Sequence, residues 1–348
     1  MTSKTAKQPT NQYVEMLEKE INKEYGKGVI KNGADFVKKN QIIVPISPAF
    51  DVACGGVPTG GFTTLYGPPK VGKSVTALQI AANAQDPEYA TDGEPEGRHI
   101  YYHNLEHRVQ ARDIQGIVNI ELGRFHLIES IKGRILSAEE HLTLAEKTIK
   151  THPGSIIIFD SVAAMCTETE LNKGMGDFQR ADAQRLLAKF CRRVAPSVYV
   201  NDCMVISITQ LMGNPGGMPG SPTTKEKGGY AIGYQVDTKL QATHCTPWKL
   251  GTGEEDDQIG QIVHWKIINS PIKGHGKKLD SYLRYGIGLD KVWELVKLGE
   301  SLGLVEKSGA WYAYKDTKAQ GIAKFVAAFY SDPTILKTLD KEIKEFYK

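Results

Sequence analysis

The sequence predicts an α/β fold with a mostly parallel central sheet. Between residues 61 and 210, segments rich in β-branched and aromatic residues alternate with segments whose apolar residues have helical spacing. Residues 155–160 (SIIIFD) carry an unbroken apolar run, which is typical of a strand buried on both faces of a parallel sheet. A glycine-rich loop separates the first of these strands from the first helix. In such folds, ligands bind outside the carboxyl ends of the strands.

The glycine-rich loop matches the phosphate-binding pattern G-x-x-x-x-G-K-[ST]. Its residues are Gly67, Pro68, Pro69, Lys70, Val71, Gly72, Lys73 and Ser74. We expect a strand at 61–66 and a helix at 75–85 around it, which is the order that the motif requires. Backbone N–H groups would then surround a phosphate, with Lys73 reaching the β- and γ-phosphates and Ser74 coordinating Mg²⁺. A chance glycine-rich turn is the alternative, and the flanking strand and helix argue against it.

The composition is that of an ordinary globular protein. The 348 residues are 41% hydrophobic and 24% charged, and no apolar run approaches the length of a membrane span. The first residues are polar and lack the apolar core of a secretory signal, so we expect a cytoplasmic protein. Five widely spaced cysteines without a C-x-x-C pair are interpreted as reduced thiols without a metal site. A net charge of +3 neither requires nor excludes a nucleic-acid partner.

An amphipathic helix is expected before the phosphate-binding loop. Tyr13, Met16, Leu17 and Ile21 have helical spacing, and Gly26 lies just past the expected end. The apolar face could pack on the protein's own core or dock on a neighbouring subunit. The pattern alone favours the first of these interpretations.

The other elements up to residue 210 follow from apolar spacing and turn residues. Ser137 and Glu140 form a candidate capping box at the start of one helix. The expected elements are strands at 41–45 and 98–106, a surface loop at 86–97, a short strand at 122–129, a helix at 137–150, a strand at 155–160, a helix at 179–194 and a strand at 203–210.

Residues 213–233 interrupt this alternation. They contain seven glycines and three prolines, carry Lys225 and Lys227, and show no apolar periodicity. A structureless segment of this length in a compact domain is usually functional or disordered. Strands are expected beyond it at 235–243 and 261–269, followed by helices at 291–302, at 322–329 and after residue 332. The predicted organisation is an N-terminal segment with a helix at 1–40, an ATPase core at 41–280 and a small C-terminal α/β domain at 281–348.

Three polar residues stand at the ends of predicted strands: Glu106, Asp160 and Gln210. The ends of neighbouring parallel strands meet at one edge of a sheet, so these side chains are expected beside the phosphate-binding loop. Asp160 suits the Mg²⁺ side of such a site, and Glu106 could orient or deprotonate an attacking water. Gln210 could hydrogen-bond a γ-phosphate and transmit its presence to the segment that follows. Each residue could otherwise be a polar strand terminus facing solvent.

With these residues aligned, residues 11–348 resemble the RecA family of DNA recombinases. The resemblance is carried by 25–28 (YGKG), 66–68 (YGP), 72–74 (GKS), 105–107 (LEH), 159–164 (FDSVAA), 174–177 (GMGD), 209–210 (TQ) and 309–314 (GAWYAY). It implies a DNA-dependent ATPase that forms a filament on single-stranded DNA and pairs it with homologous duplex DNA in recombination and repair. The expected location is the nucleoid, or the host cytoplasm if a phage encodes the protein.

The resemblance also implies roles for individual residues. Glu106 would be the hydrolytic carboxylate, Asp160 the acid on the Mg²⁺ side and Gln210 the γ-phosphate sensor. Two DNA-binding loops would fall at 167–177 and 213–229, and the segment before residue 41 would dock on the adjacent subunit. The implied DNA-binding residues are Met175, Gly176, Gly213, Lys225, Lys227, Gly228 and Gly229.

The sequence departs from the family pattern in three places. Residues 211–222 lack the basic residues that the family often carries there. Family members place two lysines on a neighbour's γ-phosphate, and in this sequence only Lys266 falls close to their positions. The chain ends in mixed charge rather than in an acidic tail. An ATP-binding DNA filament or mediator without strand exchange is therefore the main alternative, and a P-loop enzyme acting on a small molecule or protein is a second one.

Overall fold

The computed structural model describes residues 12–31, 33–38, 41–91, 95–172, 182–213, 224–227, 235–250 and 258–347. These form two compact units, 1–42 and 43–348. The first contains the predicted amphipathic helix α1 (Gln12–Tyr25) and a short helix α2 (Gly33–Lys38). Gly26 follows α1 with a left-handed φ of 98°, as expected for a glycine just past a helix end.

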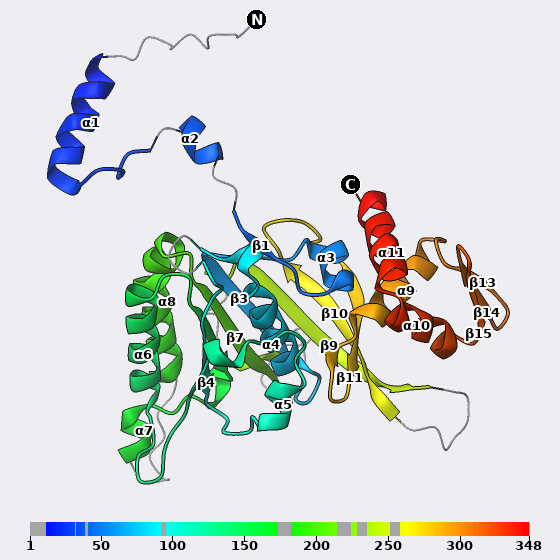
Figure 1. Ribbon diagram of the computed structural model, residues 1–348. Helices are drawn as coiled ribbons and strands as arrows, with labels where there is room; N and C mark the ends of the chain where they lie inside the picture. The colour runs from blue at the N-terminus through cyan, green and yellow to red at the C-terminus, as the bar shows by residue number, and fades with distance from the viewer. Residues whose placement is uncertain are drawn as a thin grey trace, which may run out of the picture. The chain divides into compact units, whose positions relative to one another are not determined.

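The second unit is built on a ten-stranded sheet whose central part is parallel (Figure 1). Its order is β12-β11-β10-β9-β3-β7-β6-β4-β5, and β8 pairs with β7 outside this path. All pairs from β9 to β5 are parallel, whereas β8, β10, β11 and β12 are added antiparallel. The strands are β3 (Gly61–Gly67), β4 (Ile100–Asn104), β5 (Phe125–Ile128), β6 (Ile156–Asp160), β7 (Met204–Gly213), β8 (Thr224–Lys227), β9 (Thr238–Lys249), β10 (Gln258–Asn269), β11 (Lys278–Arg284) and β12 (Gly288–Leu289). The predicted α/β fold with a mostly parallel sheet is confirmed.

Helices cover both faces of the parallel strands. On one face lie α3 (Pro48–Cys54), α4 (Lys73–Ala84) and the strand pair β1 (Ile43–Val44) and β2 (Val57–Pro58). On the other, α6 (Ala138–Thr151) and α8 (Asp182–Val200) pack side by side (Figure 1). The short helices α5 (Ala111–Gln115) and α7 (Glu168–Asn172) lie in connections.

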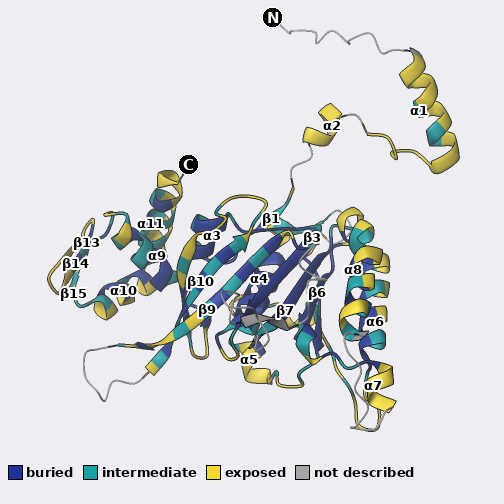
Figure 2. Cartoon of the chain, turned by 180° about the vertical axis from the view of Figure 1, so that it is seen from behind, coloured by how far each residue is buried: buried dark blue, intermediate teal, exposed yellow. Residues whose placement is uncertain are grey.

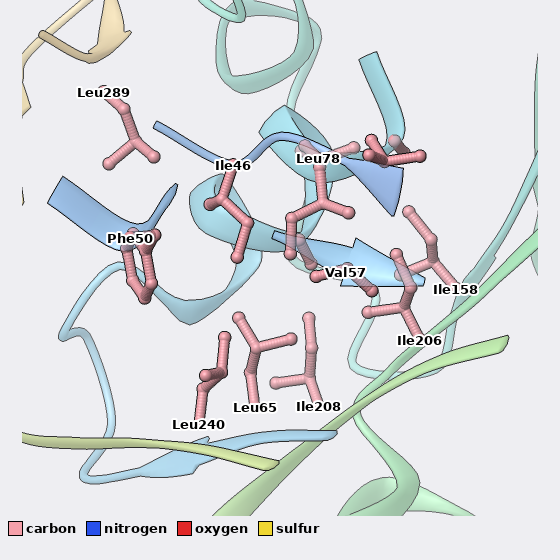
Figure 3. Packing of buried hydrophobic residues seen from close by; sticks show 14 of the residues in the cluster. Ile46, Phe50, Val57, Leu65, Leu78, Ile158, Ile206, Ile208, Leu240 and Leu289 are labelled. Atoms are coloured by element: carbon pink, nitrogen blue, oxygen red, sulfur yellow. The ribbon is translucent and has the colours of Figure 1, made fainter. Parts of the chain in front are cut away.

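The side chains of the buried strands alternate between two apolar clusters, as the period of two in a strand requires. Ile156 and Ile158 of β6 belong to the cluster on the α4 face, and Ile157 and Phe159 belong to the cluster under α6 and α8. Figure 2 shows β3 and β6 in the colour of buried residues over most of their length. In Figure 3, strand residues such as Ile158 converge with Leu78 of α4. Burial on both faces explains the unbroken apolar run at 155–160.

The predicted capping box at the start of α6 is confirmed. The Ser137 hydroxyl accepts a hydrogen bond from the Glu140 backbone N–H at 3.2 Å, and the Glu140 carboxylate accepts one from the Ser137 backbone N–H at 3.0 Å. These two bonds satisfy N–H groups that the helix itself leaves without partners.

The segment 213–233 is not structureless throughout. Gly213 is the last residue of β7, and residues 224–227 form β8, which pairs antiparallel with β7. Strand β4 also ends at Asn104, so Glu106 lies two residues beyond the strand that was predicted to end with it.

The C-terminal region combines three helices with a three-stranded antiparallel sheet. The helices are α9 (Lys291–Ser301), α10 (Ile322–Ser331) and α11 (Pro333–Phe346), and the strands are β13 (Glu306–Ser308), β14 (Trp311–Tyr314) and β15 (Thr317–Gln320). A third apolar cluster includes Trp293, Phe325 and Phe329 from the helices and Trp248 from β9. Throughout the described ranges, no helix has both the length and the apolar character needed to cross a membrane.

A buried carboxylate links α9 to the rest of this unit and makes stability depend on pH. Glu294 is only 1% exposed, and it accepts hydrogen bonds from the backbone N–H groups of Ala49 at 3.1 Å and Tyr282 at 3.4 Å. Burial raises the pKa of Glu294 to about 7. At pH values between the pKa of a glutamate in the unfolded chain and the pKa of about 7 in the folded protein, Glu294 keeps a proton that the unfolded chain releases. The free energy of unfolding must therefore fall as the pH rises through that window, by roughly 3 kcal/mol.

We expect Glu294→Gln to reduce this pH dependence, because glutamine has no charge to bury. The variant should gain stability relative to the parent as the pH rises from 5 to 8, measured as the urea midpoint at each pH. Asp51, whose pKa burial also raises to about 7, will leave a residual slope. The control is Glu345→Gln on the exposed surface of α11. Parallel pH profiles for Glu294→Gln and the parent would contradict this prediction.

Candidate nucleotide-binding site

The phosphate-binding loop connects β3 to α4 and depends on glycine at its first position. A Cβ atom on Gly67 would lie 2.2 Å from the backbone carbonyl oxygen of Ala242, on the neighbouring strand β9. Gly72 precedes α4 with a left-handed φ of 88°, which an L side chain rarely adopts. The loop therefore holds a shape that a phosphate can approach closely, with the N-terminus of α4 next to it.

Lys73, the first residue of α4, is buried beneath this loop. Its Nζ donates hydrogen bonds to the backbone carbonyl oxygens of Gly67 at 3.2 Å and Pro68 at 2.5 Å. Burial lowers the pKa of Lys73, and the nearby carboxylates of Asp160 and Glu106 partly oppose that shift. The amine thus lies within the loop, where a phosphate oxygen could replace a carbonyl as its acceptor.

Asp160, the last residue of β6, accepts hydrogen bonds from two hydroxyl groups. Tyr102 donates to Asp160 Oδ2 at 2.5 Å, and Ser74 of the phosphate-binding motif is the second donor. Burial raises the pKa of Asp160, whereas these two hydrogen bonds act to lower it. Burial and the adjacent carboxylate raise the pKa of Tyr102, so the phenol keeps its proton and donates. The Ser74 hydroxyl and the Asp160 carboxylate are hard oxygen ligands of the kind that Mg²⁺ prefers, so these residues fit the ion.

Glu106 lies directly beside Asp160 because of the pairing between β4 and β6. The backbone N–H groups of Leu105 and Glu106 donate to the Asp160 carbonyl oxygen at 2.9 and 3.1 Å. Glu106 Oε1 accepts hydrogen bonds from the Ser161 hydroxyl at 2.5 Å and from Gln210 Nε2 at 2.7 Å. The structure therefore brings Glu106, Asp160 and Gln210 together at one edge of the sheet.

Three contacts in this group were not anticipated from the sequence. Tyr102 and Ser161 donate to the two carboxylates, and Arg108 Nη1 lies 3.4 Å from Glu106 Oε2. Ser161 follows Asp160 directly, and Tyr102 stands two residues before Asn104, the partner of Asp160 in the sheet. The positions of Ser161 and Tyr102 near the ends of predicted strands were the available signal. They indicate a contact with the carboxylates only when the register between β4 and β6 is known.

Comparison with known proteins decides the family. A model of the RecA N-terminal domain matches residues 12–290, and a model of the RecA C-terminal domain matches residues 293–348. The chain belongs to the RecA family. It is 29% identical over 335 residues to Protein RecA of Streptococcus sanguinis (strain SK36), covering 94% of this chain and 83% of that protein. It is 28% identical over 332 residues to Protein RecA of Pseudomonas putida, covering 94% and 87%.

The remaining residues that the RecA resemblance singled out lie on β7, β8 and β10 or outside the described ranges. Lys266 is on β10, where the register places it in one row with Gln241 of β9 and Tyr66 of β3. In β8, Lys227 pairs with Gln210 and Lys225 with Met212. Gly213 ends β7. Met175, Gly176, Gly228 and Gly229 lie outside the described residues.

We expect Gly67→Ala to weaken nucleotide binding by more than about tenfold, because the new methyl group would meet an immovable backbone carbonyl. Titration with a fluorescent ATP analogue measures this affinity. Gly133→Ala is the control: Gly133 has a left-handed φ of 83°, but a Cβ there has no atom within 4 Å. Parent-like affinity in Gly67→Ala would contradict the expected tight fit of the loop.

Proposed function

We propose that the protein is an ATP-dependent recombinase, which forms a filament on single-stranded DNA and pairs it with homologous duplex DNA. The observation that carries this proposal is the hydrogen bond from Gln210 Nε2 to Glu106 Oε1. Gln210 lies on β7, which continues to Gly213 at the start of the second proposed DNA-binding loop. One hydrogen bond thus joins the nucleotide site to a proposed DNA-binding segment. The proposed location is the cytoplasm.

The residues around the loop support hydrolysis of ATP to ADP and phosphate. Lys73 would bind the β- and γ-phosphates, while Ser74 and Asp160 would hold Mg²⁺ directly or through its water. Mg²⁺, when bound, neutralises charge on the β- and γ-phosphate oxygens. Glu106 would orient a water molecule and accept its proton. Ser161 and Gln210 already hold one of its carboxylate oxygens, Oε1, in place.

Gln210 would report the γ-phosphate to the DNA-binding segment. Its amide can donate to Glu106 or to a γ-phosphate oxygen, and a switch of partner would pull on β7. Since β8 pairs with the last residues of β7, from Gln210 to Gly213, that movement would reach residues 224–227. This arrangement supports a DNA-dependent ATPase in which nucleotide state and loop order are coupled.

DNA binding is assigned to the segments 167–177 and 213–229. Met175 would insert between bases without reading them, and Lys225 and Lys227 would neutralise phosphates. The glycines at 176, 213, 228 and 229 would let the backbone approach the DNA closely. Recognition of sequence then belongs to base pairing between the DNA strands.

The filament requires contacts between subunits. We assign docking on the adjacent subunit to residues 1–40, which include the amphipathic helix α1. Lys266 is assigned to the neighbour's γ-phosphate, so that ATP would be hydrolysed at the contact between subunits. Residues 41–280 would form the ATPase core, and residues 281–348 a small C-terminal domain.

A second candidate is an ATP-binding DNA filament or mediator without strand exchange. It is favoured by the single lysine near the position of the family's lysine pair, and by the lack of basic residues in 211–222. An assay for joint molecules between single-stranded DNA and homologous duplex separates the two. Filament formation without joint molecules would favour this candidate over a recombinase.

We expect Glu106→Gln to bind ATP as the parent does but to lose at least about 100-fold in turnover, because glutamine cannot accept the proton of the attacking water. Steady-state phosphate release measures turnover, and a fluorescent ATP analogue measures affinity. Lys73→Ala, which removes the phosphate-binding amine, serves as the blank for both. Parent-like turnover in Glu106→Gln would remove Glu106 from the proposed role.

The affinity for single-stranded DNA should fall steeply with salt, because it rests on phosphate contacts. Replacing both Lys225 and Lys227 by alanine should make the slope of log K against log salt shallower by about 1.4, because each neutralised phosphate contributes roughly 0.7 to that slope. Fluorescence anisotropy of a labelled oligonucleotide over a salt series measures the slope. Lys147→Ala on the exposed face of α6 is the control. A slope that stays the same in the double variant would exclude these lysines as phosphate-binding residues.

A further inference from the structure

A buried tyrosine outside the nucleotide-binding motifs contacts the carboxylate assigned to Mg²⁺. Tyr102 lies on β4 and is completely buried in the cluster on the α4 face of the sheet. The register of the parallel strands pairs Tyr102 with Ile158 and Asn104 with Asp160. From this position the Tyr102 hydroxyl reaches Asp160 Oδ2 at 2.5 Å.

The direction of this hydrogen bond is fixed by chemistry. A phenol keeps its proton at neutral pH, and a carboxylate has only acceptors to offer. Tyr102 therefore occupies one acceptor site of Asp160 with a donor that the core holds in place. Its ring lies against Phe125 of β5, with centroids 5.9 Å apart, so the hydroxyl cannot swing away without disturbing the core.

The carboxylate is thus held from two sides. Tyr102 donates from β4, on the side of the core, and Ser74 donates from the phosphate-binding motif. Ser74 is itself assigned to the metal, so its hydroxyl must also interact with the ion when ATP is bound. The Tyr102 hydroxyl is not assigned to the metal. Its hydrogen bond to Asp160 can therefore hold the carboxylate both with and without the ion.

We propose that Tyr102 is a positioning residue for the metal site: its hydroxyl fixes the Asp160 carboxylate, whose remaining acceptor sites would be available to Ser74 and to Mg²⁺. The inference rests on the proposed function of Asp160. Partners that hold a metal ligand in place typically contribute 10- to 100-fold to metal affinity. A purely structural tyrosine would instead use Asp160 only to satisfy its own buried hydroxyl, and its loss would leave the metal affinity unchanged.

The test is the affinity for Mn²⁺, used in place of Mg²⁺, in the presence of ADP. Electron paramagnetic resonance measures free Mn²⁺ directly and needs no turnover. We expect Tyr102→Phe to weaken Mn²⁺ binding by about tenfold, with little change in the affinity for ADP without metal.

A matched control removes the same kind of hydrogen bond far from the site along the chain. Tyr314 is buried, and its hydroxyl donates to Glu342 Oε2 at 2.9 Å in the C-terminal region. Tyr314→Phe should bind Mn²⁺ with ADP as the parent does. Equal Mn²⁺ affinity in the parent and Tyr102→Phe would overturn the inference alone. A parent that binds no Mn²⁺ with ADP would overturn the proposed metal site and the inference with it.

A second measurement keeps the test valid if Tyr102→Phe does not fold. 3-Fluorotyrosine at position 102 keeps the hydroxyl and nearly the same shape, and its ¹⁹F resonance reports the environment of the phenol. We expect the resonance to shift when Mg²⁺ is added to the ADP-bound protein, because the carboxylate that it contacts becomes a metal ligand. The same label at position 314 should not shift. An unmoved resonance at position 102 would overturn the proposal.

Discussion

The pairing of β4 with β6 is the constraint on which the site depends. Because Asn104 lies opposite Asp160, the chain leaves β4 at the point where the acid ends β6. The next two backbone N–H groups donate to the Asp160 carbonyl oxygen, which holds Glu106 close to Ser161 and Gln210. A shift of one residue in this register would turn the Tyr102 side chain to the opposite face of the sheet, away from Asp160.

The site places charges where burial disfavours them. Burial lowers the pKa of Lys73 and raises the pKa of Asp160, so each group is driven toward its neutral form. Their attraction opposes both shifts, and the hydroxyl groups of Tyr102 and Ser74 further support the charged carboxylate. The two apolar clusters on the faces of the sheet stabilise the strands from which these groups extend. A site of this kind is prepared for an anion and a cation together, since either one alone would leave a buried charge poorly compensated.

Much of this arrangement is local in the sequence and could be predicted. The phosphate-binding loop, the buried strand ending in Asp160 and the position of Gln210 each follow from a short pattern. The contacts of Tyr102 and Ser161 could not be predicted, because they depend on the register between strands more than 50 residues apart. Strand β8 was missed for a related reason: residues 224–227 show no apolar pattern, and their extended form comes from pairing with β7. Strand β14 was also not predicted, because it is short and lies between expected helices. Its sequence does place Tyr312 and Tyr314 two residues apart, as in a strand with one buried face, and the structure buries both.

We propose that the nucleotide site and the DNA-binding segments act as one unit through Glu106 and Gln210. Steady-state ATP hydrolysis with and without single-stranded DNA tests it most directly, with Lys73→Ala as the blank. We expect DNA to stimulate the turnover of the parent strongly, and Gln210→Ala to lose this stimulation. Turnover that is the same with and without DNA would contradict the coupling.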